Sequence, residues 1–192
     1  MGNYWENLLQ LLGNALTNAD SKKELKPAVV SAFGDIATAI GPDFAPYLEF
    51  VLRTCTEAGN IQPQDGSIDT LDFVFNVRES VLDCFVGIVG GFINQPQALA
   101  PAIVTILQYL QKVTLDPQMS SSESVARSAA GLLGDIAAMY PNGEFKQVFT
   151  EEWVTDFIKR TRSNPLFDNK TKDAARWARD QQKRQQQQLF GQ

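Results

Sequence analysis

The chain has 192 residues, 44% of them hydrophobic, which is enough to bury a sizeable core. It contains no histidine and two cysteines, so the usual zinc-binding sets and every histidine-based catalytic triad are excluded, and we expect no enzymatic activity, metal or cofactor. The net charge is −5, and residues 1–116 carry 13 Asp or Glu against 6 Lys or Arg, a surplus that attracts basic partners and repels nucleic acid.

Apolar residues recur at helical spacing from the start of the chain. We predict a first helix over 4–18, and because no polar cap helix precedes it we expect a fragment of a longer protein. Ser21 and Glu24 form a capping-box pattern ahead of a second helix, which ends at Gly41-Pro42. These two helices make a first predicted pair.

Three further pairs are expected. The next begins after Pro42 and contains a loop over 59–67 and a long helix over roughly 69–93. The third opens at Pro96 and closes near Tyr140. The last has an approach helix around Trp153 and a final helix from Thr171 to about Leu189, whose glutamine run, Gln185–Gln188, we expect to be a fraying terminus.

The two cysteines, Cys55 and Cys84, lie within apolar helical patterns. This position predicts reduced core thiols and an intracellular compartment, with a disulfide between them as the alternative. No signal peptide is apparent, and no apolar run approaches the length of a membrane span. We therefore expect a soluble protein with no membrane partner.

A nine-residue segment is nearly repeated: Phe33–Gly41 returns as Leu133–Pro141. Each copy closes an amphipathic helical pattern and precedes another, so the repeated unit is a helix pair of the HEAT or armadillo size. We predict an all-α fold, a right-handed α-solenoid of about four HEAT repeats. The expected repeats are 3–41, 42–94, 95–141 and 142–190, forming a single domain over 1–192.

The long helix carries a polar ridge. At 100° per residue, four side chains fall within about 60° of one another, opposite the apolar stripe of the same helix; they are Asp72, Asn76, Glu79 and Asp83. Two interpretations are open: a plain solvated face, or a ladder of acids that binds lysine and arginine. We call this set the acidic ridge.

Other candidates lie on the second helices of other pairs. Asp35 and its repeat Asp135 fall on free faces, although an aspartate inside a stacked pair can equally bond a neighbouring loop. Trp177 lies on the same side of the final helix as Asp173, which favours a receptor for a basic side chain. The alternative is that Trp177 caps the core.

Several motifs together resemble the C-terminal region of the importin-β family in their order and spacing. They are Lys-Pro-x-x-x-Ser-x-Phe-Gly-Asp-Ile-Ala from Lys26, Arg78-Glu79-Ser80, Gly87-Ile88-Val89, Ala130–Asp135, Arg160-Thr161-Arg162-Ser163 and Thr171–Ala178. The resemblance covers nearly the whole chain, and the glutamine-rich ending is closer to fungal members.

The resemblance implies a non-enzymatic nuclear import receptor that shuttles between cytoplasm and nucleus and associates with the nuclear envelope. It implies binding of importin-α, through its basic N-terminal segment, and of other basic cargo. It matches Trp177 to a tryptophan that packs on the basic helix, and it places Asp83 on the inner surface. Phe-Gly nucleoporins are further expected partners, and Ran-GTP contacts are expected mainly outside this chain. The alternative function is a HEAT scaffold of another intracellular assembly.

Overall fold

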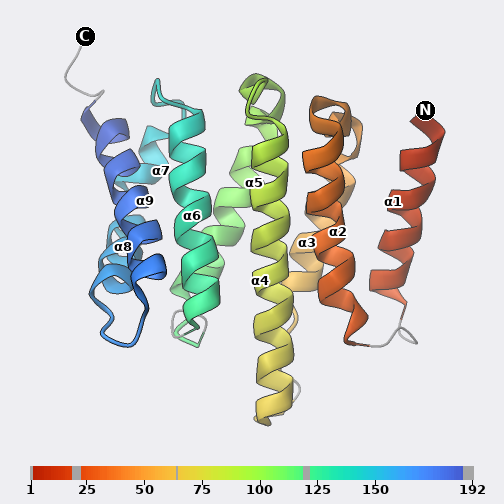
Figure 1. Cartoon of the computed structure of the whole chain (residues 1–192), viewed down its shortest axis with the longest axis horizontal. Helices are drawn as coiled ribbons and strands as arrows, with labels where there is room; N and C mark the ends of the chain where they lie inside the picture. Colours follow the sequence, from red (N-terminus) through yellow and green to blue (C-terminus); the bar gives the residue numbers. More distant parts are fainter. Residues whose placement is uncertain (1, 19–22, 64, 119–121, 188–192) are drawn as a thin grey trace. The chain divides into compact units, whose positions relative to one another are not determined.

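The computed structural model describes residues 2–18, 23–63, 65–118 and 122–187. Every regular element in these ranges is helical, which confirms the predicted all-α class. The elements (Figure 1) are α1 (Gly2–Thr17), α2 (Leu25–Ile40), the 3₁₀ helix η1 (Gly41–Tyr47), α3 (Leu48–Gly59), α4 (Ile68–Gly91), α5 (Pro96–Leu115), α6 (Glu123–Met139), α7 (Lys146–Thr150), α8 (Glu152–Ser163) and α9 (Asn169–Gln187). They group into two compact units, residues 1–102 and 103–192. The Ser21 cap lies outside the described residues.

The first unit is organised by the close packing of α2 along α4 (Figure 1). A Cβ atom added at Gly34 would lie 2.8 Å from the Cα of Cys84, and one at Gly87 would lie 2.6 Å from the carbonyl oxygen of Gly34. The Thr38 hydroxyl donates to the Gly87 carbonyl at 3.1 Å. The two backbones therefore touch without side chains between them, which only glycine permits.

The apolar stripe predicted for α4 forms the core of this unit. Its members are all buried: Val74, Val77, Val81, Phe85 and Ile88. Cys55 on α3 and Cys84 on α4 are buried free thiols with their sulfur atoms 3.8 Å apart, which confirms the prediction of core thiols. Their mutual hydrogen bond, together with burial, raises the pKa of Cys84 well above its ordinary value.

Two local features of this unit were not predicted. The segment after Pro42 forms η1 rather than the start of an α-helix, because Pro46 has no N–H to donate to the carbonyl of residue 42. Arg78 is buried, and its guanidinium donates to the carbonyls of Gly59 at 3.0 Å and Ile61 at 3.1 Å. This arginine holds the start of the 60–67 loop against α4.

In the second unit, α9 packs along α6 on one side and against α8 on another (Figure 1). Buried glutamines of α9 reach the ends of neighbouring helices. Gln185 donates to the carbonyls of Ala137 at 2.8 Å and Tyr140 at 2.6 Å, and Gln182 donates to the carbonyl of Phe149 at 2.9 Å. The prediction of a fraying terminus is therefore wrong for Gln185, because its amide satisfies carbonyls at the end of α6; Gln188 lies outside the described residues.

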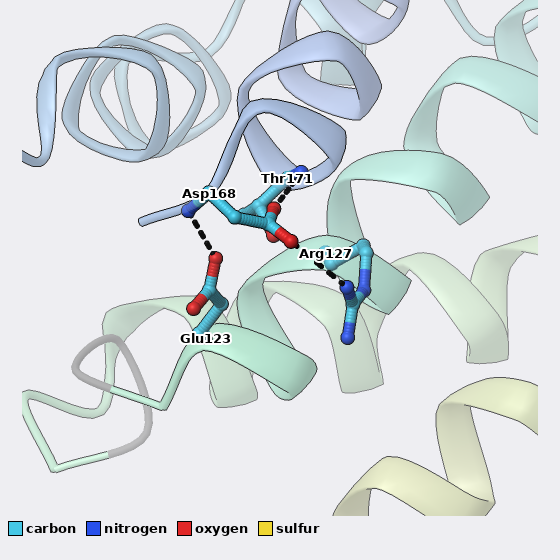
Figure 2. A network of polar contacts seen from close by, with 4 residues as sticks. All are labelled: Glu123, Arg127, Asp168 and Thr171. Atoms are coloured by element: carbon cyan, nitrogen blue, oxygen red, sulfur yellow. Dashed lines mark hydrogen bonds and ion pairs between the residues drawn. The ribbon is translucent and has the colours of Figure 1, made fainter. Parts of the chain in front are cut away.

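The loop before α9 is fixed to the start of α6, as Figure 2 shows. The Asp168 backbone N–H donates to the Glu123 carboxylate at 2.5 Å, and the Asp168 carboxylate accepts from the Thr171 backbone N–H at 2.7 Å. Arg127 lies 3.8 Å from the same carboxylate. Asp168 thus caps α9 while linking it to α6.

One helix of the described chain, α5, has the length and mean hydropathy of a membrane-crossing helix, although no apolar run of the sequence was expected to approach that length. Such a match by composition is also common among core helices. Leu99, Ile103, Ile106 and Leu110 of α5 are fully buried within the protein. This burial is the pattern of a core helix.

Candidate protein-binding surfaces

An acidic groove of about 690 Å³ lies in the first unit, between the start of α2 and the exposed side of α4. All four residues of the acidic ridge line it. The remaining lining residues are Lys23, Glu24, Pro27, Asp69, Thr70, Phe73 and Ser80. Asp72, Asn76 and Asp83 are exposed and Glu79 is half-buried, so the ridge faces solvent as the helical periodicity predicted.

The charge of this groove is strongly negative. Five carboxylates line it, and Lys23 is the one base among the described lining residues. Lysine and arginine side chains would enter a region where the potentials of several acids add, while the half-buried Phe73 offers apolar surface for their alkyl stems. Such a groove suits an extended series of basic residues on one face of a helix.

Two acids of the groove were missed by sequence reasoning. Asp69 lies one turn before Asp72 on α4, so the same angular sorting could have included it. Glu24 comes from the residues preceding α2, and no local pattern relates it to α4. The structure leaves Asp35 exposed on α2 and outside the lining of this groove.

In the second unit, Trp177 of α9 meets the repeated Gly-Asp pair of α6. The indole N–H of Trp177 donates to the Asp135 carboxylate at 3.4 Å, and the tryptophan remains 42% exposed. Burial raises the pKa of Asp135, and the hydrogen bond from Trp177 opposes this effect. Asp173 is exposed and pairs with Arg176 on its own helix. Asp135 is therefore the carboxylate beside the indole nitrogen of Trp177, while Asp173 forms an ion pair with Arg176.

A smaller hollow of about 250 Å³ lies in the second unit, beside α5 and α7. Apolar and amide side chains dominate its lining, which consists of Val104, Leu107, Gln108, Gln111, Phe145, Val148, Glu151 and Trp153. The Trp153 indole donates to the Glu151 carboxylate at 2.8 Å, which fixes one wall. The hollow can accept a single large apolar side chain. No pattern in the sequence identified it, because its lining comes from two distant stretches, residues 104–111 and 145–153.

The described part of the chain contains no group of three or more His, Cys, Asp or Glu side chains that could hold a metal ion. Successive helix pairs whose second helices pack side by side, as α2 packs on α4 and α6 on α9, define the class of helical-repeat proteins.

Comparisons with known proteins identify the family. Residues 1–162 match the family described as importin subunit beta-1-like, TPR repeats, and the chain belongs to this family. It is 49% identical over 182 residues to importin subunit beta-1 of Saccharomyces cerevisiae, covering 95% of this chain and 21% of that protein. The resemblance inferred from the motifs is thereby confirmed.

Solved structures agree. The chain is similar to a Kap95:Nup1 complex, with a TM-score of 0.84 and 48% identity over 96% of this chain and 22% of that one. It is also similar to Kap95p in a structure where binding induces the switch loops of RanGDP to adopt the GTP-bound conformation, with a TM-score of 0.87 and 48% identity over 97% and 22% of the respective chains. The chain thus has the HEAT-repeat fold of importin-β and spans about a fifth of its relatives' length.

Proposed function

We propose that this chain is the part of a nuclear import receptor that binds a basic helix in its acidic groove. The basic N-terminal segment of importin-α and similar basic cargo segments are the proposed occupants. The observation that carries this proposal is the convergence of the acidic ridge with Glu24 and Asp69 in one groove. Membership of the importin subunit beta-1 family supports it.

The wider role follows from the same membership. The receptor would shuttle between cytoplasm and nucleus and associate with the nuclear envelope during passage through the pore. Ran-GTP contacts would lie mainly in repeats outside this chain. The competing function, a HEAT scaffold whose acidic ridge is merely solvated, remains an outcome of the first experiment.

Neutralising the ridge tests the groove. Asp72→Asn, Glu79→Gln and Asp83→Asn together should weaken binding of an Arg- and Lys-rich helical peptide about tenfold, since each exposed ion pair contributes from a few tenths to about 1 kcal/mol. The salt dependence of binding should flatten as well, because fewer opposite charges meet. Fluorescence titration at low and physiological salt measures both effects.

A matched control changes the same number of charges elsewhere on the first unit. Asp43→Asn, Glu49→Gln and Glu57→Gln are all exposed positions outside the groove lining. This variant should bind the peptide nearly as well as the unaltered chain. Equal losses in the two variants would mean that net charge alone attracts the peptide, and unchanged binding in the ridge variant would favour the scaffold function.

Phe-Gly nucleoporins are a second proposed partner, and the hollow beside α5 and α7 is their proposed site. Its size and apolar lining suit a phenylalanine side chain, and the similar Kap95 structure is of a complex with Nup1. Affinity for one such side chain is low, so several sites along a receptor would act together.

Placing a charge in this hollow tests the assignment. Val104 is 50% exposed, so Val104→Glu should fold normally while putting a carboxylate where the phenyl ring would lie. Leu115→Glu, at a 55% exposed position on the same helix outside the hollow, is the control. A Phe-Gly repeat peptide should shift amide resonances around Phe145 and Val148 in the control and not in Val104→Glu. Equal shifts in both variants would assign the peptide to another surface.

A further inference from the structure

The second copy of the repeated Gly-Asp pair lies directly against Trp177. A Cβ atom added at Gly134 would lie 2.5 Å from the indole nitrogen and closer still to the adjacent ring carbon Cδ1. One edge of the indole therefore occupies space that any other residue at 134 would fill. The neighbouring Asp135 accepts the indole N–H. Both contacts come from α6, and Trp177 as a whole residue remains 42% exposed.

The first copy makes a different contact. Gly34 also has no room for a side chain, but there the space is filled by the backbone of α4, at Cys84 and Asp83. Asp35 is exposed, whereas Asp135 is half-buried. Close helix packing thus explains glycine in both copies, while the aspartate and its aromatic partner distinguish the second.

We propose that Gly134 and Asp135 are positioning residues for Trp177. Gly134 leaves the space that seats one edge of the indole, and Asp135 fixes the ring through its N–H, so that the exposed face is held in one orientation for a lysine or arginine side chain. This inference rests on the proposed function, because it assumes that a basic partner uses Trp177.

Fixing the ring improves binding in two separable ways. A side chain already held in its bound orientation loses less rotational freedom when the partner arrives, and that saving corresponds to about 2- to 12-fold in affinity. The carboxylate beside the ring adds negative potential, which favours a cation over a neutral side chain on the ring face. Asp173 is placed to contribute less to this potential, since Arg176 pairs with it.

Three variants separate these contributions. Asp135→Ala removes the acceptor, Asp135→Asn keeps an acceptor oxygen without the charge, and Gly134→Ala removes the seat. Gly131→Ala is the matched control, because it lies on the same helix and a Cβ atom there would meet nothing within 4 Å. Since Gly134→Ala challenges the α6–α9 contact, circular dichroism and thermal melts establish which variants fold, and Asp135→Ala serves if Gly134→Ala does not.

The first readout uses the full chain without any partner. Nuclear magnetic resonance of ¹⁵N-tryptophan-labelled protein gives an indole N–H signal for each tryptophan, and Trp177→Phe identifies the relevant one. That signal should shift and broaden in Asp135→Ala and Gly134→Ala, and stay sharp in Asp135→Asn and Gly131→Ala. An unchanged signal in folded Asp135→Ala and Gly134→Ala would overturn the positioning role, whatever the binding results.

The second readout is titration with an Arg- and Lys-rich helical peptide. Asp135→Ala should weaken binding about 2- to 12-fold, and Asp135→Asn should weaken it less, with a flatter salt dependence. Trp177→Ala should weaken binding more than either. Altered indole signals combined with unchanged affinity in Trp177→Ala would support the positioning role and overturn the use of this ring by a basic partner.

Discussion

At the level of single residues, the glutamines of α9 act as caps for other helices. The carbonyls at the end of α6 have no partner within their own helix, and the buried Gln185 amide supplies one to Ala137 and Tyr140. A glutamine can do this because its two N–H donors lie at the end of a long side chain. Gln185, the first residue of the run of glutamines, is therefore part of the core of the second unit, whereas Gln187 is exposed.

Removing this cap should be costly. Gln185 is 1% exposed, and Gln185→Ala would remove its hydrogen bond to the Ala137 carbonyl and leave the Tyr140 carbonyl with the longer bond from the Gly143 N–H at 3.3 Å. The substitution should therefore lower the free energy of unfolding by about 1–3 kcal/mol. Urea denaturation followed by circular dichroism measures the loss. Gln187→Ala, at an exposed position on the same helix, should change stability little. Equal stability of the two variants would show that water replaces the Gln185 amide.

At the level of elements, helix positions were largely predictable and helix ends less so. Apolar periodicity located α4 and its buried stripe, and Gly41, with a φ of 59°, ends α2 where the sequence indicated. Local patterns did not predict the 3₁₀ helix η1 or the burial of Arg78 within α4. The burial of Arg78 depends on carbonyls left at the end of α3, and no periodicity on α4 reveals those acceptors.

The start of α9 should depend on pH. Several contacts lower the pKa of Asp168 below its ordinary value of 3.8, and the hydrogen bond from the Thr171 backbone N–H has the largest effect. A lowered folded-state pKa contributes stability above pH 3.8, and this contribution is lost as the pH falls through the lower folded value.

Thermal melts of the unaltered chain and of Asp168→Asn between neutral pH and strong acid test this expectation. The unaltered chain should melt higher at neutral pH, and the difference should shrink as Asp168 becomes protonated. A difference that stays constant with pH would assign the effect of the substitution to shape or hydrogen bonding rather than to charge.

For the molecule as a whole, the acidic ridge could be predicted because all four of its residues lie on one helix, where 3.6-residue periodicity places them on the same side. The contact between Asp135 and Trp177 could not, although both residues were candidates. They lie 42 residues apart on different helices, and their meeting depends on how α6 and α9 pack. Helical periodicity predicted Asp173, on the same helix, as the charged neighbour of the ring. In the structure the carboxylate that accepts the indole N–H is Asp135 of the adjacent helix α6.

The lack of space for a side chain at Gly34 and Gly134 also explains why the repeated segments share part of their sequence. Two segments a hundred residues apart share Gly-Asp-Ile-Ala. The glycine, isoleucine and alanine of each copy are buried, so a change of volume at these positions meets a neighbouring helix. The aspartate is not confined in this way. Asp35 is exposed and Asp135 is half-buried, so the same residue has different surroundings in the two copies. The buried residues that the two copies share therefore reflect tight packing. The difference between the copies lies in the surroundings of the aspartate, which the sequence alone does not reveal.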